Sequence, residues 1–149
     1  MLKPLIMKST NQVIAAIIFL FLTACSKKED TLSNTEKLTS GTWKNTAAMY
    51  DNDGNGTYET DEYANIAACY KDNYFTFFTG GTMEINEGPA KCDPADPQTE
   101  TITWQFSNNE TSITIGGDTY ELLELNNSAL KLKQVLGAGR SALITFAKR

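Results

Sequence analysis

The feature that most constrains the fold is a series of short segments with the alternating pattern of β-strands. Eight such segments occur between residues 43 and 147. In 101–106, for example, Ile102, Trp104 and Phe106 alternate with polar residues, so one face would be buried and the other exposed. Dipeptides that favour tight turns separate several of the segments: Gly80-Gly81, Asn108-Asn109, Gly116-Gly117 and Asn126-Asn127. The pattern predicts an all-β fold, an eight-stranded antiparallel up-and-down barrel wide enough for one small ligand.

The expected strands are 43–50, 74–79, 82–86, 100–107, 112–115, 119–125, 129–135 and 142–147. Within 120–125 the alternation changes phase in the middle, which indicates a bulge or a bend. No internal repeat and no second block of composition occurs, so the strands belong to a single domain.

A second pattern lies between the first two strands, from Asp51 to Glu62. Oxygen-bearing side chains alternate at its start, glycine occupies its sixth position and glutamate its twelfth, a spacing that resembles the calcium loop of EF-hands. Calcium takes about six to eight oxygen ligands, and such a loop brings them together. The candidate metal ligands are Asp51, Asp53, Asn55, Thr57 through its carbonyl, Glu59 and Glu62. A solvated turn is the other interpretation, because Asp, Asn and Gly also favour turns.

The helix that enters an EF-hand is missing, because residues 43–50 have the pattern of a strand. We therefore expect an EF-hand-like loop on a β-scaffold, followed by a short helix from residue 63 with Thr60 as its N-cap. A calcium ion there would be structural, since external calcium is abundant and such modules bind it at about 10⁻⁴–10⁻³ M.

Residues 1–24 have the features of an export signal. Lys3 and Lys8 precede an apolar stretch at 13–22, which is shorter than the roughly 20 residues of a membrane span. Leu22-Thr23-Ala24-Cys25 resembles a bacterial lipobox. The resemblance implies cleavage before Cys25 and attachment of acyl chains such as palmitate, which would anchor the protein to the outer membrane, on its periplasmic or its exposed side. The alternative is an ordinary secretory signal with a chance cysteine.

Residues 25–38 would then be a lipidated tether, and residues 39–149 the barrel domain. Loss of Lys3 and Lys8 with the signal changes the formal net charge from −5 to −7. Such an acidic surface argues against nucleic acid as a partner, because phosphates require a basic patch.

Gly41-Thr42-Trp43 opens the first strand, and Cys69 and Cys92 flank the 74–86 hairpin. Two cysteines in an exported chain favour a disulfide, with two free thiols as the alternative. The G-x-W and the placing of the cysteines resemble the lipocalin-like domains of small bacterial lipoproteins. The resemblance implies a tryptophan across the closed end of the barrel and a small apolar ligand inside it. The candidate wall is Trp104, Phe106, Phe75, Phe77, Tyr120 and Ile144. The same side chains could also fill a barrel that has no cavity.

Catalytic patterns are missing from the sequence. There is no histidine, and no serine lies in a G-x-S-x-G motif, so the usual triads and histidine-ligated zinc are excluded. The densest acidic residues belong to the loop at 51–62. We therefore expect a binding protein and not an enzyme. The alternative to a small-ligand carrier is a calcium-braced interaction or adhesion module, or an accessory subunit, of a cell-envelope complex.

Overall fold

The computed structural model describes residues 32–149. The chain divides into two units, Met1–Asp30 and Thr31–Arg149, of which the structure describes the second. The expected signal peptide, Cys25 and the first part of the expected tether lie outside the described residues. The second unit has a hydrophobic core of its own, which extends from Leu38 to Phe146.

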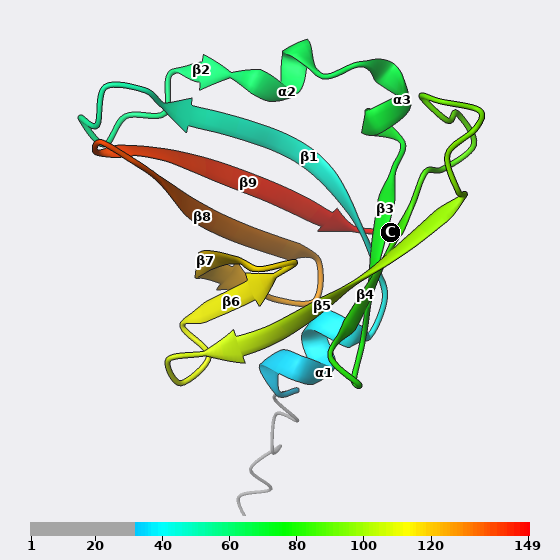
Figure 1. Cartoon of the computed structure of the whole chain (residues 1–149). Coiled ribbons are helices and arrows are strands. Elements are labelled where there is room, and N and C mark those ends of the chain that lie inside the picture. Colours follow the sequence, from blue (N-terminus) through cyan, green and yellow to red (C-terminus); the bar gives the residue numbers. More distant parts are fainter. Residues whose placement is uncertain (1–31) are drawn as a thin grey trace, which may run out of the picture. The chain divides into compact units, whose positions relative to one another are not determined.

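Nine strands and three short helices make up this unit (Figure 1). In chain order they are α1 (Asn34–Thr39), β1 (Thr42–Asp51), β2 (Thr60–Asp61), α2 (Glu62–Asn65), α3 (Ala68–Lys71), β3 (Tyr74–Phe78), β4 (Thr82–Asn86), β5 (Thr99–Ser107), β6 (Ser112–Ile115), β7 (Asp118–Leu125), β8 (Ala129–Gly137) and β9 (Arg140–Lys148).

Eight of the strands form a closed antiparallel barrel, which confirms the predicted fold. From β3 to β9 each strand pairs with the next along the chain, as in an up-and-down barrel. The barrel closes where β1 pairs with β9, from Trp43 opposite Lys148 to Asp51 opposite Ser141. The predicted strand positions are confirmed to within a few residues at each end. The two-residue β2 was not predicted.

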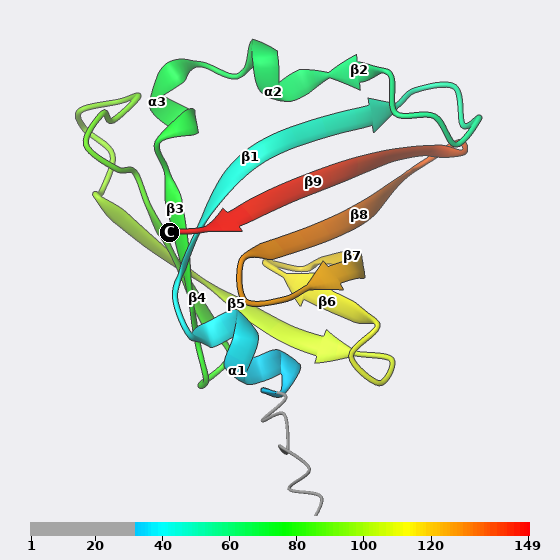
Figure 2. The same cartoon turned by 180° about the vertical axis from the view of Figure 1, so that it is seen from behind.

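The wall of the barrel is incomplete between β1 and β3. These strands pair only at Thr42 with Thr76 and at Trp43 with Phe75, and above this point they separate. The chain from β2 through α2 and α3 arches across the gap (Figures 1 and 2). We call residues 60–73 the cover segment. Two contacts hold it to β1. The strand β2 pairs with Met49 and Tyr50, and the Tyr63 hydroxyl donates to the carbonyl of Asn45 at 3.1 Å.

The helix α1 closes the other end of the barrel. Ser33 and Glu36 form a capping box, in which each side chain accepts from the other residue's N–H and fixes the start of the helix. Leu38 in this helix and Trp43 at the start of β1 are fully buried, and the Trp43 indole N–H donates to the Leu38 carbonyl at 2.8 Å. Residues 34–38 are therefore part of the folded barrel unit.

Two local predictions have different outcomes. The phase change in 120–125 is confirmed as a β-bulge, because the register of β7 with β8 shifts between Leu122 and Glu124. The predicted N-cap, Thr60, is wrong. Thr60 is the first residue of β2, and the Asp61 side chain instead caps α2 by accepting from the Ala64 N–H at 3.0 Å.

The β6–β7 connection has the two-residue turn that its sequence predicts. Gly116 and Gly117 have φ values of +59° and +101°, which suit a type I′ turn and a side chain could adopt only with strain. The turn lies at the end of the barrel opposite α1. That end carries the cover segment and the connections 87–98 and 138–139 as well, and we call it the mouth.

Candidate functional site

The barrel contains a cavity on the mouth side of its packed core. Its volume is about 410 Å³. Inward-facing side chains of β3 to β9 line it, and most of them are apolar because alternate residues of each strand point inward. The lining residues are Phe75, Phe77, Met83, Ile85, Glu100, Ile102, Ile115, Gly116, Asp118, Tyr120, Leu132, Ile144 and Phe146. We call this cavity the main chamber.

Four of the six predicted wall residues line the main chamber: Phe75, Phe77, Tyr120 and Ile144. Trp104 and Phe106 do not, because they lie further toward the closed end. There the Trp104 indole N–H donates to the carbonyls of Phe78 and Thr82, at 3.1 and 3.0 Å. Its ring meets those of Phe77 and Phe106 edge to face, with centroids 5.6 and 5.4 Å apart.

A second chamber of about 330 Å³ adjoins the first beneath the cover segment. Both chambers are lined by Phe75, Ile144 and Phe146, and the rings of Phe75 and Phe146 meet edge to face with centroids 5.5 Å apart. The remaining lining comes from β1 and from the cover segment and its end: Asn45, Ala48, Tyr50, Ile66, Tyr70 and Asn73. No sequence pattern indicates this chamber, because it exists only where β1 and β3 separate.

The main chamber has a polar rim as well as an apolar wall. Tyr120 is half-buried, and its pKa is raised by burial and then by the nearby Asp118 carboxylate and Tyr50. The phenol therefore stays neutral well above neutral pH. Glu100 and Asp118 are the charged residues of the lining.

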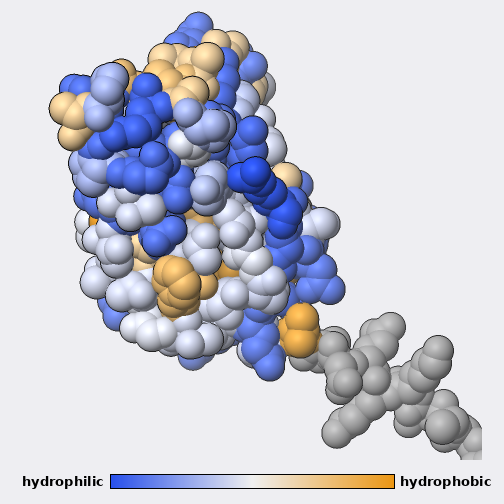
Figure 3. Space-filling view, turned by 90° about the vertical axis from the view of Figure 1, so that its right-hand side faces the viewer, coloured by the Kyte–Doolittle hydropathy of each residue, from blue (hydrophilic) through white to orange (hydrophobic). Residues whose placement is uncertain are grey.

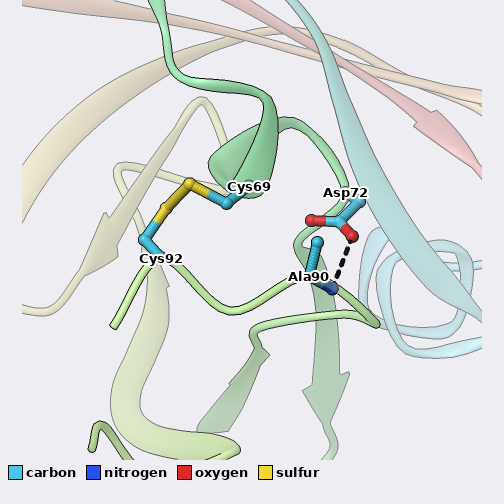
Figure 4. Close-up of a disulfide and its surroundings, with 4 residues drawn as sticks. All are labelled: Cys69, Asp72, Ala90 and Cys92. Atoms are coloured by element: carbon cyan, nitrogen blue, oxygen red, sulfur yellow. Dashed lines mark hydrogen bonds between the residues drawn. A yellow bond between two sulfur atoms is a disulfide. The ribbon is translucent and has the colours of Figure 1, made fainter. Parts of the chain in front are cut away.

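The predicted disulfide between Cys69 and Cys92 is confirmed (Figure 4). It joins α3 in the cover segment to the β4–β5 connection. Beside it the Asp72 carboxylate accepts from the Ala90 N–H at 3.0 Å. The Asn73 amide group donates to the carbonyls of Cys69 and Glu87, at 3.1 and 2.9 Å. The far end of the cover segment is thus fastened to the rim of the barrel.

The acidic loop after β1 brings together three of the predicted metal ligands. One carboxylate oxygen from each of Asp51, Asp53 and Glu59 lies within 4.8 Å of the others. Asp51 is only 3% exposed and accepts from the N–H groups of Gly54, Asn55 and Gly56, at 2.8, 3.2 and 3.0 Å. Burial alone would raise the pKa of Asp51, but these N–H groups together hold it below its usual value. Its carboxylate is therefore charged at neutral pH.

The other three predicted ligands are arranged differently. The Asn55 amide group donates to the Asp53 carboxylate at 2.9 Å, and its oxygen accepts from the Thr57 N–H at 2.7 Å. Glu62 begins α2 and lies outside the cluster of three carboxylates. The oxygens present suit a hard cation, and the cluster could hold a metal ion with three carboxylates as ligands.

The loop is packed against the β8–β9 turn. A Cβ built on Gly54 would lie 3.1 to 3.3 Å from backbone atoms of Gly139. The backbones of the loop and of the turn therefore approach each other closely, which glycine permits because it has no side chain. The Ser141 hydroxyl donates to the Tyr58 hydroxyl at 3.2 Å.

Among residues 32–149, no helix has the length and apolarity needed to cross a membrane.

Known proteins similar to this chain were found by sequence family and by structure. A family model described as a lipocalin-like domain matches residues 39–132. The crystal structure of a DUF4847 family protein from Bacteroides vulgatus is similar with a TM-score of 0.51 and 16% identity, covering 78% of this chain and 98% of that one. That of a lipocalin-like protein from Bacteroides uniformis has a TM-score of 0.41 and 19% identity, covering 76% and 99%. No curated protein matches the chain.

Proposed function

Because this chain belongs to the family of lipocalin-like domains, we propose that it is a carrier that holds a small, largely apolar molecule inside its barrel. The observation that carries the proposal is the main chamber. Its volume of about 410 Å³ falls within the roughly 300–1,000 Å³ of small-molecule sites, and its wall is mainly aliphatic and aromatic. The second chamber extends the space available to an elongated ligand.

Filling the chamber tests this function. Ile102 lines the chamber, whereas its neighbour Thr101 is exposed on the outer face of β5. Ile102→Trp should abolish binding of long-chain alcohols, measured by calorimetric titration, and Thr101→Trp should leave it unchanged. Ile102→Trp should also fold normally, since the new ring enters empty space. A barrel filled by its own side chains would instead lose about 1–3 kcal/mol of stability on overpacking, and neither protein would bind.

The carrier would be anchored in the bacterial envelope through a lipidated Cys25, as the lipobox-like sequence suggests. The position of α1 supports this proposal. The described chain enters the barrel at its closed end, so an anchor on that side would leave the mouth, at the other end, accessible to a ligand. Mass spectrometry of the protein from membranes would test it. Acylated Cys25 at the new amino terminus is expected, and an unmodified cysteine would contradict the anchor.

Calcium is the metal we propose for the acidic loop, with Asp51, Asp53 and Glu59 as its side-chain ligands. The support is that three carboxylates converge on a loop of the kind that binds hard cations. The ion would be structural, because the same loop packs on the β8–β9 turn at Gly139. Comparing melting curves in calcium and in chelator tests this, and a melting temperature that is the same in both would contradict it.

An interaction module remains the second candidate, on one observation. Val135 and Leu123 are 71% and 46% exposed, and both line a shallow depression beside the acidic loop. By contrast, the side of the barrel that carries β3 to β5 is mostly hydrophilic, with separate apolar spots (Figure 3). If this depression binds an envelope protein, Val135→Lys should abolish the association and leave the binding of alcohols unchanged.

A further inference from the structure

The charges around the two chambers are all of one sign. Glu100 and Asp118 line the main chamber, and the residues that line the second chamber carry no charge. Among the described residues, no lysine or arginine lines either chamber. An anionic head group would therefore enter a negative potential with no partner for its charge.

An acidic cleft opens directly beside the main chamber. Its volume is about 200 Å³, and it shares Ile85 and Glu100 with the chamber. The rest of its lining comes from the β4–β5 connection, namely Glu87, Asp96 and Pro97. Three carboxylates thus surround a small space at one end of an apolar cavity.

Glu87 in this cleft lacks part of its hydrogen bonding. Its carboxylate oxygen Oε2 is buried and has no donor among the described residues. This one oxygen is out of water without a hydrogen bond, which is costly, and a nearby positive charge would offset that cost.

The nearby lysines bond to backbone carbonyls and form no ion pair with the carboxylates of the cleft. The Lys91 ammonium donates to the carbonyls of Pro94 and Asp96 in its own loop. The Lys71 ammonium donates to the Ala64 carbonyl at 3.1 Å. The two ion pairs of the described residues join β7 to β8 and do not involve the cleft. They are Lys131 with Glu124 and Lys133 with Glu121.

We propose that the ligand is a cationic amphiphile, whose apolar body occupies the main chamber and whose ammonium group lies in the cleft of Glu87, Asp96 and Glu100. This inference rests on the proposed carrier function and specifies its ligand class. The apolar wall accounts for the body of the ligand, and the shared residues Ile85 and Glu100 place the cleft directly beside the chamber.

Three ligands with the same chain length test the charge preference: dodecylammonium, dodecanol and dodecanoate, each titrated calorimetrically below its micelle concentration into the Thr31–Arg149 unit. This unit has its own core, as shown above. Because hydrogen bonds between charged groups are stronger than those of a neutral hydroxyl, the ammonium should bind roughly 10- to 100-fold more tightly than the alcohol. Dodecanoate should bind most weakly.

Two variants locate the effect. Glu87→Gln combined with Asp96→Asn, two residues that line the cleft but not the main chamber, should bring the affinity for the ammonium close to that for dodecanol, and leave dodecanol binding unchanged. The control is Glu110→Gln combined with Glu124→Gln, which removes the same charge away from the cleft, from the β5–β6 turn and the outer part of β7. This control should keep the preference.

The outcomes are distinguishable. If dodecanoate binds as tightly as the ammonium or more tightly, the proposal is overturned and the carrier function stays intact. The same holds if the cleft variant and the control variant lose the preference for the ammonium over dodecanol to the same extent. Binding of none of the three ligands would overturn both the proposal and the carrier function.

Discussion

Replacing Cys69 and Cys92 together by alanine should lower the free energy of unfolding by about 3.4 kcal/mol. The two cysteines are 23 residues apart, and closing a loop of that length in the unfolded chain removes about 11 cal/mol/K of entropy in the loop-closure model. At 25 °C that entropy corresponds to the stated free energy. For a domain of this size 1 kcal/mol corresponds to about 4 °C, so the melting temperature should fall by roughly 14 °C.

The native contacts at the bridge should survive this change. The hydrogen bonds from Ala90 to Asp72 and from Asn73 to Glu87 hold the cover segment to the β4–β5 connection without the disulfide. Urea unfolding of the oxidised protein, the reduced protein and the double variant measures the effect, and the last two should agree. A loss below about 1 kcal/mol would refute the loop-closure argument, because the unfolded chain would then gain little freedom. A much larger loss would show that the bridge also maintains native packing.

Three further variants test single contacts. Trp43→Phe should cost about 1–3 kcal/mol in urea unfolding, because the buried Leu38 carbonyl loses its donor; no loss would contradict that role. Asp53→Asn should remove the rise in melting temperature that calcium causes, yet lower the value in chelator only slightly, because the hydrogen bonds of Asp53 with Asn55 are exposed. Asp51→Asn should lower both values, because Asp51 also holds three backbone N–H groups. The pKa of the half-buried Tyr120 is raised, so above about pH 10 this tyrosine ionises more readily in the unfolded chain than in the folded one. The free energy of unfolding should therefore fall with rising pH, and it should fall less steeply in Tyr120→Phe.

The strands could be predicted because their period is local. In β5 the apolar residues Ile102, Trp104 and Phe106 fall on one face, and that face is the inner one. Alternation gives the face of a side chain but not its depth along the barrel. Ile102 therefore lines the chamber, whereas Trp104 and Phe106, two and four residues further on, pack in the core.

The position of Glu62 could not be predicted for a different reason. The calcium pattern assumes that the twelfth residue returns to the first, but β2 pairs antiparallel to β1, with Thr60 opposite Tyr50 and Asp61 opposite Met49. Each step therefore carries the chain about 3.3 Å further back along β1, and Glu62 begins α2 roughly 10 Å from the level of Asp51. Such a pairing depends on the free edge of β1, which no pattern within the loop itself reveals.

The pairing of β1 with β9 has a consequence for how the barrel forms. Trp43 and Lys148 lie near opposite ends of the described chain. The edge of β1, the first strand to be synthesised, therefore stays uncovered until β9, the last strand, has been synthesised. Contacts between such distant residues form slowly, and an uncovered edge strand is prone to pair with other chains. Loss of the final nine or ten residues would thus leave β1 unprotected along most of its length, and we expect such a truncated chain to aggregate during biogenesis instead of forming an open but soluble barrel.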